Sequence, residues 1–415
     1  MDNGAKKQLG KSVLWNTLGN IVYYASQYVL LILVMWMADS RHSGMLSTAM
    51  SAAAIFISVA NYGMRSFQIS DFEKKYTDAT YLRSRWLTVG AAGIACVVFS
   101  LAISYTAEQR WIIVLYTLGR LSEGYIDVWH GFLQKADRMD LVGILFGIRG
   151  LLTMAGFGLG LLFSKNLIVT LAVLAVLSWG CALVCDIPPS RRRADFAAPR
   201  AGAVGMLLWE CAPLAVFSLL NSSIGSVVKL YCERITGAEA FAWFNSVFQP
   251  VQIIQVGAMY IFAPFMMTFA RLWQKRDAAG YRRAFGLTAA AMPALWALGA
   301  AAAALLGPFF LSILYPAPIL DYAFLLQPAV VAAVTNIFVS VLCYLLSMMR
   351  EMKGLIAANL AGIAAAFLLS APMISSMGVA GAAWATVAAR GVQALCSLAV
   401  VLWCCRKHFA AQGQQ

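Results

Sequence analysis

Long apolar segments separated by short polar ones alternate along the chain from about residue 12 to residue 403. Each apolar segment has about 20 to 30 residues, which is enough for a helix to cross the roughly 30 Å hydrocarbon core of a bilayer. The pattern predicts twelve membrane-spanning helices, at approximately residues 12–38, 43–62, 86–106, 111–134, 139–163, 166–186, 204–230, 239–269, 284–306, 321–348, 354–374 and 378–403. The sequence therefore predicts an all-α integral membrane protein.

The longest polar interruption, residues 187–202, contains three consecutive arginines and three prolines. It predicts a cytoplasmic linker between two six-helix bundles, residues 1–186 and 203–415. An internal repeat supports this division, because residues 75–91 and 275–291 are identical at seven of seventeen positions when the sequence is shifted by 200. Six spans return the chain to its starting side, so the two repeats are expected to be parallel.

Composition and charge agree with this topology. Hydrophobic residues make up 61% of the chain and charged residues 12%, against about 45–50% and 25% in soluble domains. The net charge of +13 would suggest nucleic-acid binding in a soluble protein. With both termini cytoplasmic, however, twenty-three Lys and Arg residues fall in cytoplasmic segments and four on the other side. The positive-inside rule thus accounts for the charge without a nucleic-acid partner.

Motifs for soluble chemistry do not appear in the sequence. Residues 4–12 approach a phosphate-binding loop, but five residues separate the glycines where the motif has four, and no strand precedes them. The nine cysteines show neither zinc nor haem spacing. We therefore expect no metal site, no catalytic residues and no cofactor. The first apolar run continues for about 25 residues without a small-residue cleavage site, so we expect a retained span rather than a signal peptide.

The span at residues 111–135 carries more polar side chains than a membrane helix usually tolerates. At about 100° per residue its polar positions fall within an arc of roughly 80°. An ionised group near the bilayer centre costs about 2.5–3.5 kcal/mol, so such a stripe is expected to face partners or a water-filled path. We expect this polar stripe to line a transport path from mid-membrane to the cytoplasmic mouth. Its members are Arg120, Glu123, Asp127, His130 and Gln134.

Further ionisable residues lie within other predicted spans. Arginine pairs bidentately with phosphate, so buried cations favour an anionic solute. Two carboxylates four residues apart repel each other when both are ionised, so one can exchange a proton and couple transport to a proton or sodium gradient. The candidate substrate-cavity residues are Arg120, Arg149, Arg390 and Lys229, and the candidate ion-coupling residues are Glu123, Asp127 and Glu210.

A purely structural interpretation of the same charges stays open. Arg120 and Glu123 are spaced to neutralise each other on one helix face. Asp127 could reach Arg149 on the next span in the same way. Long side chains can also extend to the membrane surface, which would remove Lys229 and Glu210 from the path.

Three segments carry a resemblance to a known family: KSVLWNTLGNIVYYASQYVLLILV at residues 11–34, GFLQKADRMDLVGILFGIRGLL at residues 131–152 and LLSMMREMKG at residues 345–354. They resemble polysaccharide flippases of the multidrug/oligosaccharidyl-lipid/polysaccharide exporter superfamily. The resemblance implies a twelve-helix protein of the bacterial inner membrane that flips a polyprenyl-pyrophosphate-linked oligosaccharide for O-antigen, lipopolysaccharide or capsule synthesis. It implies a cationic cavity, here at Arg120, Arg149 and Arg390. Membrane lipids, a polysaccharide polymerase and glycosyltransferases are candidate partners.

Two other functions remain as alternatives. A proton- or sodium-coupled multidrug or cation antiporter of the same superfamily would share the fold and the carboxylates, but arginines in both halves suit it less well. A membrane glycosyltransferase or repeat-unit polymerase would usually have a long periplasmic loop with charged residues. The longest predicted external stretch, residues 307–320, carries no charge, so we expect a transporter rather than an enzyme.

Overall fold

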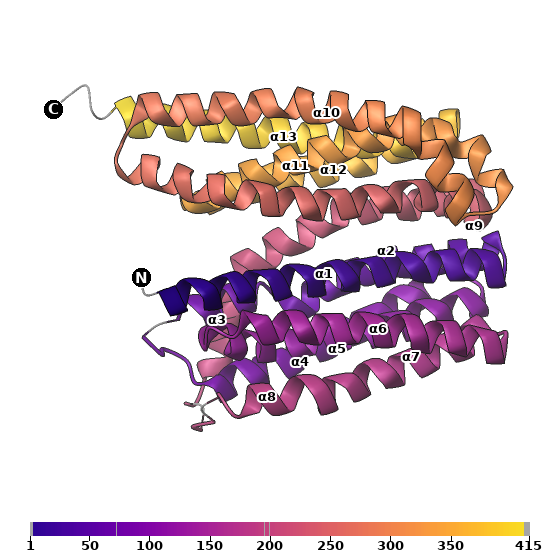
Figure 1. Ribbon diagram of the computed structural model, residues 1–415, viewed down its shortest axis with the longest axis horizontal. Helices are drawn as coiled ribbons and strands as arrows, with labels where there is room; N and C mark the ends of the chain where they lie inside the picture. The colour runs from indigo at the N-terminus through magenta and orange to yellow at the C-terminus, as the bar shows by residue number, and fades with distance from the viewer. Residues whose placement is uncertain (1–2, 72, 195, 199, 411–415) are drawn as a thin grey trace. The chain divides into compact units, whose positions relative to one another are not determined.

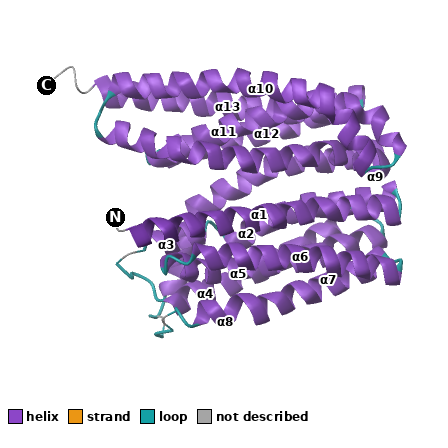
Figure 2. Cartoon of the chain, viewed as in Figure 1, coloured by secondary structure: helices purple, strands orange, loops and turns teal. Residues whose placement is uncertain are grey.

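The computed structural model describes residues 3–71, 73–194, 196–198 and 200–410, and side chains for these residues outside 3–11, 251–261 and 263–265. The described residues are helical or lie in short connections, and they contain no strand (Figures 1 and 2). The α-helices are α1 (Asn3–Met37), α2 (Ser40–Asn61), α3 (Met64–Ser70), α4 (Asp78–Ala102), α5 (Ala107–Lys135), α6 (Met139–Ser164), α7 (Leu167–Cys181), α8 (Ile187–Arg191), α9 (Ala203–Gln274), α10 (Ala278–Leu314), α11 (Leu326–Met348), α12 (Met352–Met377) and α13 (Val379–Ala410). A π-helical turn, Ala182–Asp186, follows α7, and a 3-10 helix, Ala317–Leu325, precedes α11.

The predicted number of spans is confirmed. Ten helices within the described residues are long and apolar enough to cross a membrane. The polar helix α5 has the length of a span, with 29 residues. The 72-residue α9 is interrupted at Gly237, whose φ of 85° and ψ of 164° are not helical and are accessible mainly to glycine. With α5 added and α9 divided at Gly237, the twelve predicted spans are accounted for.

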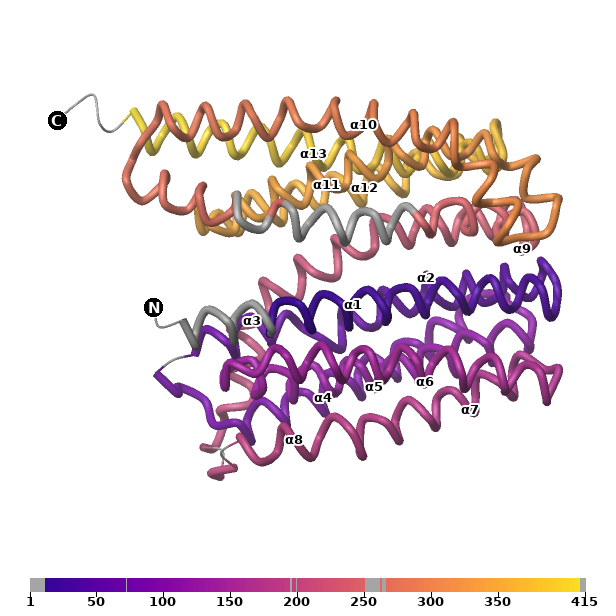
Figure 3. Tube along the Cα trace, viewed as in Figure 1, coloured from indigo at the N-terminus to yellow at the C-terminus, as the bar shows by residue number. Residues whose placement is uncertain are grey.

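The helices form two compact units, residues 1–222 and 223–415. Within each unit successive long helices run back and forth (Figure 3). The first part of α9 belongs to unit 1, where Ser58 donates a hydrogen bond of 2.7 Å to Ser222. Lys75 also forms a hydrogen-bonded ion pair with Glu210 on α9. The hydrogen bond raises the pKa of Lys75 above its ordinary value. By packing, the start of α9 groups with the helices before it. The linker predicted at residues 187–202 therefore stays a prediction.

Helices α1 and α6 approach each other unusually closely because glycines lie where they cross. A Cβ placed on Gly19 would lie 1.8 Å from the carbonyl oxygen of Gly143, and one on Gly143 would lie 2.1 Å from the carbonyl oxygen of Trp15. Small residues allow such backbone contact between membrane helices. The contact fixes α1 against α6 and so sets the position of Tyr23 on α1.

The start of α2 depends on a capping carboxylate. The Asp39 side chain accepts a hydrogen bond of 2.7 Å from the backbone N–H of His42. Burial raises the pKa of Asp39, but hydrogen bonds from the amide and ring of His42 outweigh it and hold the pKa below 3.8. The stability from this cap is therefore present above pH of about 4 and is lost as the pH falls through the lowered pKa.

We predict that Asp39→Ala lowers the free energy of unfolding by about 1 kcal/mol at neutral pH, because the first turn of α2 loses its cap. Asp39→Asn is the matched control, since an asparagine side chain can cap the same N–H group. Thermal unfolding in detergent measures both variants. Equal destabilisation by Asn and Ala would show that the carboxylate charge, rather than the cap, is what matters.

Candidate functional site

The polar stripe lies on one helix as predicted, but its side chains contact other helices instead of forming a continuous wet wall. Helix α5 contains all five stripe residues, and each is half-buried or buried. Side chains from α1, α3 and α6 and from the segments around α4 and α7 meet them in three polar clusters. The high cost of a bare charge in the membrane is thus offset by hydrogen-bonding partners.

The first cluster, which we call the Glu123 cluster, joins α5 to α1. Arg120 donates a hydrogen bond of 2.7 Å to Glu123 Oε1. The same guanidinium group donates to the hydroxyl of Tyr23 and lies 5.6 Å from the centre of the Tyr23 ring. The predicted pairing of Arg120 with Glu123 is confirmed. The Glu123 side chain nevertheless keeps 17% of its surface exposed.

A small cavity of about 10 Å³ adjoins the Glu123 cluster. Its polar lining includes a hydrogen bond of 3.1 Å from the Tyr116 hydroxyl to Gln27 Oε1. The cavity is near the lower limit for one water molecule, so in this structure it fits an ion or a proton carrier and not an organic solute. The residues with polar side chains that line it are Gln27, Tyr116, Arg120, Glu123, Thr153 and Ser178.

The second cluster surrounds Asp127. Its two carboxylate oxygens accept from Arg65, at 3.2 Å, and from Arg85, at 2.8 Å. Arg65 also donates to Gln134 at 3.0 Å. The possible contact between Asp127 and Arg149 does not form, because Arg65 and Arg85 occupy this carboxylate and Arg149 pairs with Asp186.

Arg85 is a site residue that the sequence analysis missed. The predicted span begins only at residue 86, but α4 already begins at Asp78 and the Arg85 side chain is 0% exposed. It also donates a hydrogen bond of 2.6 Å to the carbonyl oxygen of Ala60. The first two turns of α4 are polar, so the apolar pattern alone places the start of this helix too late.

The third cluster is a buried network of His130, Arg149 and Asp186. The carboxylate of Asp186 lies 2.8 Å from His130 Nε2 and accepts a hydrogen bond of 2.8 Å from Arg149. Arg149 also donates to the hydroxyl of Ser122 at 3.0 Å. All three ionisable side chains are at most 2% exposed. His130 therefore packs inside unit 1 against an acid.

Asp186 was also missed, although a signal existed. It ends the apolar run at residues 167–185, in the π-helical turn Ala182–Asp186. π-Helical turns occur often at functional sites. Arg149 lies in the middle of an apolar span and requires a carboxylate on a neighbouring helix. Asp186, at the end of the next predicted span, is such an acid.

Three of the candidate residues lie outside these clusters. Glu210 is paired with Lys75 near the start of α9. Lys229, on α9 in unit 2, donates to Asn245 Oδ1 at 2.8 Å. Arg390 on α13 is 9% exposed and donates to Gln393 Oε1 at 2.8 Å. The two candidate cavity cations of unit 2 thus contact amide oxygens, and their roles stay predictions.

The two carboxylates on the stripe differ in their surroundings. No group of three or more His, Cys, Asp or Glu side chains among the described residues could hold a metal ion. Of the carboxylates on α5, Asp127 contacts two guanidinium groups while Glu123 contacts one and adjoins a cavity. The ion-coupling role of each acid stays a prediction.

Comparison with solved structures relates the whole chain to one group of proteins. An inward-facing multidrug resistance MATE family transporter of the MOP superfamily aligns with a TM-score of 0.64 and 14% identity, covering 96% of both chains. A MATE in complex with MaL6 aligns at 0.62 and 13%, covering 99% of this chain and 97% of that one. A MOP superfamily transporter from Pyrococcus furiosus, described as having a binding pocket of reverse polarity, aligns at 0.61 and 11%, covering 98% and 96%.

No family model and no curated protein matches the sequence. At 11–14% identity, structural likeness over nearly the full length of both chains establishes the fold. The predicted exporter-superfamily fold is confirmed, with helices that account for the twelve predicted spans. The chain is a multi-pass membrane protein with the fold of the MATE transporters of the MOP superfamily.

Proposed function

We propose that the protein is a membrane transporter that exports amphipathic or cationic solutes by alternating access, driven by a proton or sodium gradient. The observation that most supports this function is the Glu123 cluster, in which an incompletely buried carboxylate lies beside an ion-sized cavity within a membrane helix bundle. Solved structures described as multidrug resistance MATE family transporters share the fold, which favours this substrate class over the others. The protein is proposed to act without chemical conversion of its solute.

The geometry supports a simple coupling step. When Glu123 binds a proton, its hydrogen bond with Arg120 loses its charge–charge attraction, and the guanidinium group is held mainly by Tyr23 on α1. When the proton leaves, the charged pair between Arg120 and Glu123 forms again. A change in protonation thus redistributes the contacts of Arg120 between α5 and α1, and this shifts the balance between two conformations.

A second candidate function is the flipping of a polyprenyl-pyrophosphate-linked oligosaccharide in a bacterial inner membrane. Lys229 and Arg390 favour it, because these cations donate to the neutral oxygens of Asn245 and Gln393. A pyrophosphate would offer both cations a charged acceptor in place of an amide. On this proposal, glycosyltransferases and a polysaccharide polymerase would be the functional partners.

Reconstitution distinguishes the two functions. Proteoliposomes carrying the protein are expected to accumulate ethidium when a proton or sodium gradient is imposed, and liposomes without protein are not. The same vesicles are then tested with a fluorescent polyprenyl-pyrophosphate oligosaccharide, whose exposure in the opposite leaflet is read by a membrane-impermeant quencher. Movement of the lipid-linked sugar alone would replace the first function by the second. Movement of neither probe would contradict both.

A further inference from the structure

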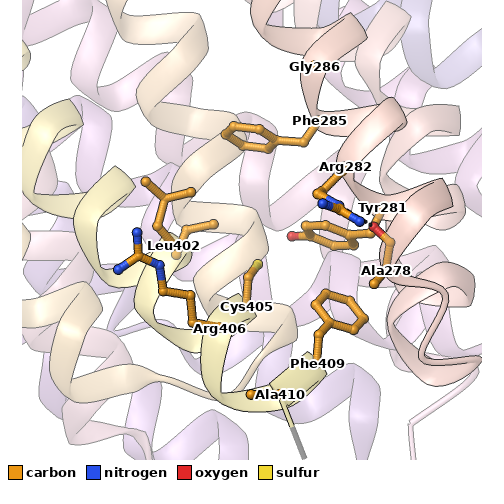
Figure 4. Close-up of a pocket in the computed structure, with 11 residues that line it drawn as sticks. Ala278, Tyr281, Arg282, Phe285, Gly286, Leu402, Cys405, Arg406, Phe409 and Ala410 are labelled. Carbon is orange, nitrogen blue, oxygen red and sulfur yellow. Dashed lines mark hydrogen bonds between the residues drawn. The ribbon is translucent and has the colours of Figure 1, made fainter. Parts of the chain in front are cut away.

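A large groove in unit 2 lies outside every cluster described above. It has a volume of about 530 Å³ and lies between the first turns of α10 and the last turns of α13. Small-molecule sites have volumes of about 300–1,000 Å³. Its walls are mostly apolar, with Phe285 on one side and Leu402 on the other (Figure 4). The rings of Tyr281 and Phe409, 5.7 Å apart, join the two helices at one end.

Tyr281 brings a weakly partnered polar group into this groove. Its side chain is 2% exposed, and its hydroxyl meets the thiol of Cys405, a weak hydrogen-bond partner, but no oxygen or nitrogen acceptor among the described residues. In Figure 4 the hydroxyl points across the groove toward Cys405 and Leu402. A buried tyrosine hydroxyl usually donates to an oxygen or nitrogen, so a ligand oxygen in the groove would be a stronger acceptor than the thiol.

The internal repeat shows what the groove lacks. At the matching position in unit 1, the Tyr81 hydroxyl donates a hydrogen bond of 2.9 Å to Asp71. A shift of 200 residues places Arg271, not an acid, at the position that corresponds to Asp71. The acidic partner in the first repeat is therefore replaced by a cation in the second, and an anion would satisfy the hydroxyl of Tyr281.

The rim of the groove carries positive charge from both walls. Arg282 projects from α10 and Arg406 from α13, and both side chains are exposed (Figure 4). The 37 residues of α10 span about 55 Å at 1.5 Å per residue, so this helix extends well beyond the hydrocarbon core. By the positive-inside rule, this end of unit 2, with its basic residues, lies at the cytoplasmic leaflet, whose lipids are anionic.

We propose that the groove binds one anionic phospholipid of the bilayer. The phosphate group is placed at the rim, where it accepts from Arg282 and Arg406, and the Tyr281 hydroxyl donates to a phosphate or ester oxygen. An acyl chain follows Phe285 and Leu402. Basic pockets between membrane helices bind anionic head groups in this way. The proposal concerns binding alone and does not depend on which solute the protein transports.

Native mass spectrometry of the full-length protein in detergent tests the site. Phosphatidylglycerol is titrated against phosphatidylcholine with identical acyl chains, and wild type is expected to bind phosphatidylglycerol more tightly. Arg282→Gln combined with Arg406→Gln is expected to weaken phosphatidylglycerol binding about 30-fold, from the loss of two cation contacts with the head group. Phosphatidylcholine binding should change little.

Two further variants make the test specific. Arg283→Gln combined with Lys407→Gln removes the same charge from adjacent positions that do not line the groove, and this pair should bind like wild type. Gly286→Leu places a side chain where a Cβ meets no atom within 4 Å, so it should fill the groove without strain and abolish binding. Equal weakening by both charge pairs, equal affinity for the two lipids, or full binding by Gly286→Leu would each overturn the proposal.

Discussion

Asp186→Leu is expected to lower the free energy of unfolding by about 3–5 kcal/mol, because it leaves Arg149 buried without its charged partner. Arg149 is 2% exposed and Asp186 is 0% exposed, so water cannot replace the lost carboxylate. The remaining acceptors of Arg149, the Ser122 hydroxyl and the Ser178 carbonyl, are neutral. Thermal or denaturant unfolding in detergent would measure the change.

The paired replacement Arg149→Met with Asp186→Leu should recover most of this stability, because apolar side chains of similar volume can replace a buried ion pair. Asp140→Leu is the matched control. Asp140 forms an equally short pair with Arg138, at 2.9 Å, but the Arg138 side chain is 34% exposed, so the expected loss is about 1 kcal/mol or less. A small loss in Asp186→Leu would show that the buried pair contributes little to the stability of unit 1.

Transport by the paired variant decides the role of Arg149. If the variant is stable and transports its solute like wild type, Arg149 acts as a structural residue that joins α6 to the turn after α7. If it is stable but inactive, the sequence prediction that Arg149 belongs to the substrate cavity holds. The paired variant keeps the fold although it lacks the ion pair. A loss of transport in this variant therefore does not come from unfolding.

Much of the fold follows from the sequence because a membrane imposes a simple rule. Every backbone polar group in hydrocarbon must be paired, so long apolar segments become helices. The span at residues 139–163 matches α6, Met139–Ser164, almost residue for residue. Errors arise at helix ends, where α4 begins at Asp78 instead of residue 86, because its first turns are polar and lack the apolar signal.

The contacts of the candidate site follow directly from the sequence where partners lie near one another. Arg120 and Glu123 are three residues apart, so helical periodicity alone predicts their contact. The partners of Asp127 and Arg149 are Arg85 and Asp186, which lie 42 and 37 residues away. Helix packing decides such contacts, and it depends on close approaches such as that of α1 to α6. The hydropathy pattern contains no information about them.

Glu123→Gln is expected to reduce gradient-driven transport to the level of protein-free liposomes. Glutamine keeps the shape of the side chain and an oxygen that can accept from Arg120, but it cannot bind and release a proton. The cluster should therefore remain folded while the coupling step fails. The measurement is ethidium accumulation in proteoliposomes under an imposed proton gradient, repeated across a range of internal pH. Wild type should show a pH dependence, whereas Glu123→Gln should show a flat profile.

Asp127→Asn is the comparison that assigns the coupling to one carboxylate. Asp127 lies between Arg65 and Arg85, so its neutralisation leaves the buried Arg85 without a charged partner and should reduce thermal stability more than Glu123→Gln does. Any Asp127→Asn protein that remains folded should still show a pH-dependent rate. If instead Asp127→Asn gives the flat profile and Glu123→Gln keeps the wild-type one, the ion is exchanged at the second cluster. The cavity beside Glu123 then has no part in coupling.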